Sequence, residues 1–247
     1  LLCLPCAYVA GQMMVVRAMV LGLDLHIIEP SGGVLDALKT TDRFRFAAMV
    51  PLQLHRALQD DRARIERQFD TILLGGGPVS EALVQDLQDV DVVILQDYGS
   101  TETLTHVAVR RLNGSARETA FRAIGDVSFA LDERGCLILN TPHLSTKRHI
   151  TNDLVRLIDA HHFDWLGQYN NVILSGGKKI FPEQLEQKTA GVIPFAHYFT
   201  AFQDDKLGQS VMLVLETDRP ADEVLPEVLE KLTAVLHRHE LPLRIKS

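Results

Sequence analysis

Residues 96–103, Gln-Asp-Tyr-Gly-Ser-Thr-Glu-Thr, decide how the rest of this sequence is interpreted. They follow an apolar run at 92–95, Val-Val-Ile-Leu, which predicts a buried β-strand. The turn after that strand combines a tyrosine ring, a glycine, three hydroxyls and a carboxylate. These groups suit a nucleotide site, because an aromatic ring can stack on a base, hydroxyls can bind phosphate oxygens and a carboxylate can bind Mg²⁺. Taken alone, the stretch is also typical of an ordinary Gly-Ser-Thr turn.

The region before this stretch alternates short apolar runs with helical patterns, which predicts an α/β fold with a mostly parallel sheet covered by helices. Residues 75–78, Gly-Gly-Gly-Pro, follow the last of these strands. Their backbone could form a wall against a flat ligand, or simply a tight turn. Ser80 is the expected N-cap of the next helix. The expected strands are 1–4, 25–28, 47–50, 71–74 and 92–95, and the expected helices are 9–21, 34–39, 52–59 and 81–88.

Beyond residue 104 the pattern changes to short strands joined by turns, which predicts antiparallel hairpins. The expected strands are 104–110, 127–131, 136–139, 154–158 and 163–166. A polar, turn-rich segment follows, and the remainder predicts a small α+β module with strands at 172–174, 197–201 and 211–215, a helix opened by Pro182 and an amphipathic helix at 225–239. We therefore expect a large domain at 1–167 and a small domain at 168–247.

The amino-acid composition limits which partners and which cellular compartment we expect for this protein. The 247 residues carry a formal net charge of -7, and no basic stripe indicates a nucleic-acid partner. No apolar run approaches the roughly 18 residues needed to span a bilayer. Three cysteines fit a reducing compartment, so we expect a cytoplasmic protein, and the sequence leaves the oligomeric state open, a homodimer included. Cys3 and Cys6 fit a C-x-x-C pattern but are expected to be buried small residues, and His161-His162 to be turn histidines without a metal.

Four motifs in a fixed order carry more information than any one of them: 75–78, 98–103, Thr-Asn-Asp at 151–153, and Gly-Gln-Tyr-Asn-Asn-Val-Ile-Leu-Ser-Gly-Gly-Lys-Lys-Ile at 167–180. Together they resemble the adenylate-forming superfamily of acyl-CoA synthetases, luciferases and peptide-synthetase adenylation domains, over nearly the whole chain. Within it the sequence most resembles the o-succinylbenzoate–CoA ligase family of menaquinone biosynthesis. That finer resemblance is carried by residues 8–18, by 105–108 and by Thr-Asn-Asp, where many relatives have Thr-Gly-Asp.

The resemblance implies a ligase that uses ATP, Mg²⁺ and coenzyme A. A small-molecule carboxylic acid attacks the α-phosphate of ATP to give an acyl-adenylate, and the CoA thiol then displaces AMP. Tyr98 would stack on adenine, Thr101 would bond the α-phosphate, Glu102 would hold Mg²⁺ and Asp153 would accept from the ribose hydroxyls. The implied nucleotide-binding residues are Gly75, Gly76, Gly77, Tyr98, Gly99, Thr101, Asp153 and Gln168, with Thr101 and Glu102 as the catalytic residues.

The same resemblance implies an acyl pocket and a mobile small domain. Tyr8, Gly11 and His106 would contact the acid, although helix-start packing explains Tyr8 and Gly11 equally well and His106 could be a satisfied histidine beside the sheet. Asn170 would be the hinge. The residues expected to face CoA in the second step are Gly176, Gly177, Lys178 and Lys179.

Three departures from the family pattern limit these expectations. The family's phosphate loop would precede Leu1, and its catalytic lysine would follow the last residue, so we expect a fragment that cannot adenylate a substrate by itself. The hinge pattern Gly-Arg-x-Asp stands here as Gly-Gln-Tyr-Asn at 167–170. Alternatives are an aryl- or fatty-acid–CoA ligase, a non-catalytic nucleotide-binding homologue, and a generic sheet protein with an unrelated glycine-rich turn.

Overall fold

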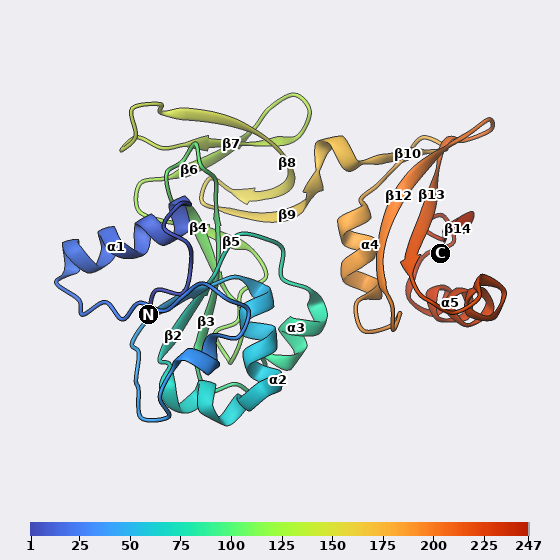
Figure 1. Cartoon of the computed structure of the whole chain (residues 1–247). Helices are drawn as coiled ribbons and strands as arrows, with labels where there is room; N and C mark the ends of the chain where they lie inside the picture. The colour runs from blue at the N-terminus through green and yellow to red at the C-terminus, as the bar shows by residue number, and fades with distance from the viewer. Residues whose placement is uncertain (247) are drawn as a thin grey trace.

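The computed structural model describes residues 1–246, and the strands of these residues form one sheet of nine strands and one of five (Figure 1). The larger sheet has the order β1-β2-β3-β4-β5-β9-β8-β7-β6. Its first three strands are parallel and all later pairs are antiparallel. These strands are β1 (Ala47–Met49), β2 (Thr71–Leu74), β3 (Val93–Gly99), β4 (His106–Arg111), β5 (Phe121–Ala123), β6 (Ser128–Leu131), β7 (Cys136–Asn140), β8 (Arg148–Asp159) and β9 (His162–Gln168).

The parallel strands are covered by helices, as their continuous apolar runs require. Figure 1 shows α2 (Pro51–Gln68) and α3 (Glu81–Asp86) beside β2 and β3. Ser80 caps α3, accepting from the backbone N–H of Leu83 at 3.2 Å, which confirms the predicted N-cap. The remaining helical elements of this part are α1 (Val9–Leu21) and the 3₁₀ turn η1 (Val34–Ala37).

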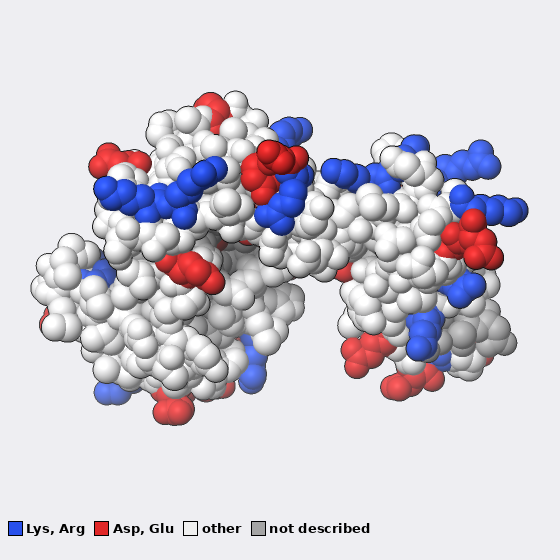
Figure 2. Space-filling model, turned by 90° about the horizontal axis from the view of Figure 1, so that it is seen from above, with Lys and Arg blue, Asp and Glu red and all other residues white. Residues whose placement is uncertain are grey.

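The smaller sheet has its own hydrophobic core and is reached through the 3₁₀ turn η2 (Tyr169–Asn171). Seen from above, the two parts are joined by a narrow neck, and acidic and basic side chains are interspersed over the face shown (Figure 2). The elements of this part are β10 (Ile173–Ser175), β11 (Lys178–Ile180), α4 (Pro182–Thr189), β12 (Ala196–Asp204), β13 (Gly208–Glu216), α5 (Ala221–Val235) and β14 (Arg244–Lys246). Within residues 1–246, no helix is both long and apolar enough to cross a membrane.

The predicted fold class is confirmed, and four details of the predicted elements are corrected. The strands expected at 1–4 and 25–28 are not formed: Leu2 makes single bridges to Ile27 and Ala48, and Pro5 lacks an N–H to extend the ladder. The helix expected at 52–59 is followed by a second helical segment that runs to Gln68, and a kink at Asp61, whose φ of -161° and ψ of 87° are not helical, separates the two. Ile65 and Gln68 of the second segment are buried. The last helix ends at Val235 because Leu236 turns extended and buries its side chain in the small core. Strands β5, β11 and β14 are short elements that no periodic pattern predicted.

Asn113 fixes the first residues of β3, the strand that carries the informative stretch. Its side chain is 1% exposed, and its amide nitrogen donates to the carbonyls of Val90 at 3.0 Å and Val92 at 2.8 Å. Its amide oxygen accepts from the backbone N–H of Ile94 at 3.1 Å. Three buried backbone groups therefore depend on one side chain, and each would be left unsatisfied without it.

We predict that Asn113→Ala lowers the free energy of unfolding by about 3 kcal/mol, since three buried hydrogen bonds are lost together. Asn140→Ala is the matched control, because the Asn140 side chain makes a single 3.4 Å bond to Ser128 and should cost less than about 1 kcal/mol. Urea denaturation of both variants measures the difference. Equal losses for the two variants would contradict the assigned role of Asn113.

Candidate functional site

Two cavities lie beside the turn after β3, and the larger of them lies where the turns after β2 and β3 meet β8 and β9. Adjacent parallel strands end at the same sheet edge, so the loops that follow them converge there. The cavity has a volume of about 580 Å³. Its lining includes six residues predicted to bind nucleotide: Gly76, Gly77, Tyr98, Gly99, Asp153 and Gln168.

Asp153 on β8 ties three side chains together at this cavity. One carboxylate oxygen accepts from the Tyr98 hydroxyl at 2.5 Å. The other accepts from the indole N–H of Trp165 at 3.0 Å and from the Gln168 amide at 2.5 Å. A carboxylate has about four lone-pair sites, so Asp153 retains acceptor capacity for one further donor. Gln168 is exposed and is the partner that a ligand hydroxyl could most easily replace.

The Tyr98 ring is held on one side by aromatic neighbours of the antiparallel region. Its centroid lies 5.7 Å from that of Phe121 and 5.1 Å from that of Phe163, the latter edge to face. Burial, reinforced by the charge of Asp153, raises the pKa of Tyr98 above its usual value, so the phenol remains a donor. The sequence therefore places a rigid, neutral ring at the end of β3.

The turn after β3 is braced from inside and presents its polar residues outward. The buried hydroxyl of Thr103 accepts from the backbone N–H of Ser100 at 3.0 Å and bonds the Thr105 carbonyl at 2.8 Å. Thr101 and Glu102 are exposed and lie outside the lining of both cavities. They directly follow Ser100, which lines both cavities, and their predicted roles stay predictions.

Glu102 offers one exposed carboxylate to a cation in this turn. Hydrogen bonds from its own backbone N–H and from the Ser100 hydroxyl lower the pKa of Glu102, which keeps it anionic. In the part of the chain that the structure describes, no group of three acidic, histidine or cysteine side chains could hold a metal ion. Mg²⁺ commonly binds through one or two carboxylates with water and substrate phosphates, so Glu102 fits that mode of binding.

Asp97 separates the two cavities and contributes to both linings. A Cβ at Gly75 would stand 2.6 Å from an Asp97 carboxylate oxygen, so the first residue of the glycine turn has to be glycine while Asp97 is in place. Burial raises the pKa of Asp97 to about 6, and the positive charge of Arg17 opposes that shift.

The smaller cavity, of about 150 Å³, lies on the α1 side of the same turn. Its lining includes Arg17 from α1 and His106 from β4. The Arg17 guanidinium donates to the Met14 sulfur at 2.9 Å and lies 4.7 Å from the Phe46 ring centroid. Burial, reinforced by the charge of Arg17, lowers the pKa of His106, so the imidazole is held neutral.

Several predicted residues are not brought to either cavity. Tyr8 is 70% exposed, and Gly11 packs against Pro5, whose carbonyl oxygen would be 2.3 Å from an added Cβ. Their neighbours Val9 and Ala10 line the smaller cavity instead. Asn170, Gly176, Gly177, Lys178 and Lys179 line neither cavity. Gly176 and Gly177 form the tight turn of the β10–β11 hairpin, with φ of 54° and 80°.

Sequence reasoning overlooked Arg17, Asp97 and Trp165. A signal existed for Arg17, because Val9, Met13 and Arg17 follow a four-residue spacing on an otherwise uncharged helix. None existed for Trp165, whose link to Asp153 depends on the pairing of β8 with β9. Cys3 behaves as a buried small residue, since burial raises the pKa of its thiol to about 11, away from the thiolate that redox chemistry needs. Cys6 is exposed, so the expectation of a buried residue is wrong at that position.

We predict that the stability of this chain falls with rising pH because of Asp97. Its native pKa of about 6 exceeds the usual value near 4, so the native state binds the extra proton between these limits. The contribution is present below about pH 4 and is lost as pH rises through about 6, about 3 kcal/mol in total. Urea unfolding at several pH values should show this fall in the wild type and not in Asp97→Asn.

The control for that measurement is Asp91→Asn, a change at an exposed aspartate just before β3. It should leave the fall between pH 4 and 6 intact. The same pH profile in wild type and Asp97→Asn would show that Asp97 is not the titrating group.

Comparison with known proteins places this geometry in a family. The family described as AMP-binding enzyme matches residues 1–142. An acyl-CoA synthetase (AMP-forming)/AMP-acid ligase II-like protein of Dyadobacter fermentans is 34% identical, with a TM-score of 0.65 over 99% of this chain and 71% of that one. The o-succinylbenzoate CoA synthetase of Bacillus subtilis, in complex with its acyl-adenylate intermediate, shares the fold with a TM-score of 0.76 at 18% identity, over 99% of this chain and 56% of that one.

A 2-succinylbenzoate–CoA ligase of Listeria monocytogenes is 22% identical over 89% of this chain and 51% of its own length. The chain spans about half the length of the first curated relatives it matches. A second structure of the Bacillus subtilis enzyme, 18% identical with a TM-score of 0.69 over 99% of this chain and 56% of that one, contains ATP and magnesium. With a family match over more than half of its residues, the chain belongs to the AMP-binding enzyme family.

Proposed function

We propose that this chain is the catalytic-site portion of an ATP-dependent acid–CoA ligase, with 2-succinylbenzoate as its acid. The observation that carries the proposal is the arrangement of two cavities around one wall. Gly76, Asp97, Gly99 and Ser100 line both of them. A nucleotide in the larger cavity and an acid in the smaller one would meet at this wall, which is what attack of a carboxylate on an α-phosphate requires.

The larger cavity is suited to a nucleoside monophosphate. The glycine turn offers a flat backbone surface, and Tyr98 offers a ring fixed by Phe121 and Phe163. Asp153 would take a ribose hydroxyl by using its remaining acceptor site or by releasing Gln168. Thr101 and Glu102 follow Ser100 of the shared wall, and phosphate groups that extend out of the larger cavity past Ser100 would reach them. When bound, Mg²⁺ would neutralise phosphate charge beside Glu102.

The smaller cavity suits an acid with a second negative charge. Arg17 carries a guanidinium that no carboxylate hydrogen-bonds among the described residues, and its neighbours Val9, Ala10 and Met13 are apolar. An aromatic acid with an additional carboxylate, as the name 2-succinylbenzoate describes, would match an apolar wall with one cation. A simple aryl or fatty acid would offer Arg17 no second carboxylate, and the guanidinium would keep only the nearby charge of Asp97.

The proposed ligase also has a small domain that moves about a hinge and faces CoA in the second step. We propose that the domain boundary directly follows β9, which ends at Gln168, one residue later than the predicted division between 167 and 168, with Asn170 as the hinge. The separate cores of the two sheets support this division. In the second step Gly176, Gly177, Lys178 and Lys179 would face CoA. Menaquinone biosynthesis in the cytoplasm would be the setting of the reaction.

A non-catalytic nucleotide-binding homologue is the second candidate, and Gln168 favours it. The family's hinge pattern has arginine at this position, and here a neutral amide donates to Asp153. Such a protein would bind AMP without forming an adenylate. Separate measurements of binding and pyrophosphate release distinguish the two.

We predict that the 247-residue chain binds AMP and that Asp153→Asn weakens binding about tenfold or more, because a charge-assisted hydrogen bond is lost. Isothermal titration calorimetry provides the dissociation constants. Asp164→Asn is the control, since Asp164 on β9 pairs with Arg156 and does not line the cavity. Failure of the wild-type chain to bind AMP, or equal binding by Asp153→Asn, would overturn the proposed site.

We also predict that Arg17→Gln weakens 2-succinylbenzoate binding about tenfold in the presence of AMP and leaves benzoate binding unchanged, because only the former has a second carboxylate for the guanidinium. Competition titrations with the two acids measure the ratio. If Arg17→Gln loses affinity for both acids equally, the specificity assigned to Arg17 is wrong and an aryl-acid–CoA ligase is the better hypothesis.

A further inference from the structure

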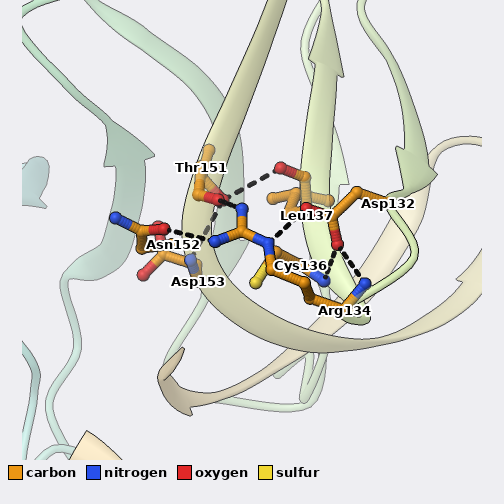
Figure 3. Close-up of polar contacts among 7 residues, drawn as sticks. All are labelled: Asp132, Arg134, Cys136, Leu137, Thr151, Asn152 and Asp153. Carbon is orange, nitrogen blue, oxygen red and sulfur yellow. Dashed lines mark hydrogen bonds and ion pairs between the residues drawn. The ribbon is translucent and has the colours of Figure 1, made fainter. Parts of the chain in front are cut away.

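The turn between β6 and β7 reaches across to the segment that joins the two sheets. Asp132 organises this turn, because one of its oxygens accepts from the backbone N–H groups of Arg134 at 2.8 Å and Cys136 at 2.9 Å. Its other oxygen accepts from the Arg134 Nε at 2.8 Å. The side chain of Arg134 is thereby aimed away from its own hairpin (Figure 3).

The two outer nitrogens of Arg134 hold the residues just before Asp153. Nη1 donates to the Asn152 side chain at 2.9 Å, and Nη2 donates to the Thr151 carbonyl at 3.1 Å (Figure 3). The Thr151 hydroxyl donates to the Leu137 carbonyl at 2.9 Å and accepts from the Asp153 backbone N–H at 3.1 Å. The guanidinium is thus two hydrogen bonds away from the backbone of the cavity carboxylate.

The flat face of the same guanidinium lies over Tyr169, the first residue of η2. The distance from the Arg134 Cζ to the Tyr169 ring centroid is 5.0 Å, within the range of a cation–π contact. Tyr169 follows Gln168, whose amide bonds Asp153. Arg134 therefore contacts the chain on both sides of the Asp153–Gln168 pair, once before Asp153 and once after Gln168.

We infer that Arg134 is a positioning residue that braces the connection between the two sheets and holds Asp153 and Gln168 toward the larger cavity. Arg134 uses three N–H donors, on Nε, Nη1 and Nη2, and one flat face at the same time. A planar guanidinium can do this, and the ammonium group of a lysine cannot. The expected effect of Arg134 on nucleotide binding rests on the proposed function. The contacts of Arg134 with Thr151, Asn152 and Tyr169, which we call the brace, do not depend on it.

The contact between Arg134 and Tyr169 depends on how the two sheets are arranged relative to one another. A change in the backbone at 168–170 would carry the Tyr169 ring off the guanidinium, whereas the bonds to Thr151 and Asn152 lie within the large sheet and would survive. Only contacts that differ between two arrangements shift the balance between them. Arg134 therefore favours the arrangement described here through Tyr169.

Hydrogen–deuterium exchange of the whole chain tests the brace. Arg134→Ala and Tyr169→Leu should each speed exchange in peptides covering 168–172 about three- to tenfold. Tyr169→Phe keeps the aromatic face and should match wild type, which a general packing defect would not predict. Arg156→Ala is the matched control, because Arg156 lies on β8 in a pair with Asp164 and is 73% exposed.

The double variant Arg134→Ala/Tyr169→Leu should exchange no faster than Arg134→Ala, since the contact between Arg134 and Tyr169 is already lost in that single variant. Additive effects, or unchanged exchange in Tyr169→Leu, would overturn the brace. Because Tyr169 is exposed, Tyr169→Leu stays informative even if Arg134→Ala folds poorly.

Titration with AMP separates this inference from the proposed function. Where wild type binds AMP, Arg134→Ala and Tyr169→Leu should weaken it about threefold and Tyr169→Phe should not. A chain that binds no AMP yet shows the predicted exchange pattern would refute the proposed function and support the brace. Normal AMP binding by all variants together with unchanged exchange would refute the brace alone.

Discussion

The carboxylate of Asp153 is the interaction on which the candidate site depends. It receives donors from Tyr98 at the end of β3 and from Trp165 and Gln168 on β9, strands that neither adjoin in the sheet nor lie near one another in sequence. Three donors on one carboxylate hold the anion in place while it is only half-buried, and they orient the phenol ring that closes the cavity. The antiparallel strands therefore complete a site that the parallel strands only begin.

The departures from the family pattern fall around this carboxylate. Gln168 replaces the hinge arginine, and Asn152 stands where many relatives have glycine. In the structure the neutral amide of Gln168 bonds Asp153, and Asn152 becomes an acceptor for Arg134. A positive charge is absent at Gln168, and Arg134 of the β6–β7 hairpin places one over the neighbouring Tyr169. The substitutions thus have structural partners within the chain.

Local signals in the sequence predicted the parts of the site that depend on local structure. The glycine turn after β2, the Tyr98 turn after β3 and the Ser80 cap follow from strand patterns and from residues with special backbone or side-chain chemistry. The partners of Asp153, the buried Asp97 and the hold of Asn113 on β3 depend on strand pairing, which no local pattern shows. The Gly176-Gly177 pair illustrates an ambiguity, because two glycines suit both a ligand loop and a two-residue hairpin turn.

The central claim is that the larger cavity receives AMP through Asp153 and Tyr98. A crystal structure of the 247-residue chain grown with AMP tests it most directly. The predicted result is an adenine between the Gly76-Gly77 backbone and Tyr98, with a ribose hydroxyl donating to Asp153. AMP bound elsewhere, or bound in this cavity without contact to Asp153, would contradict the account.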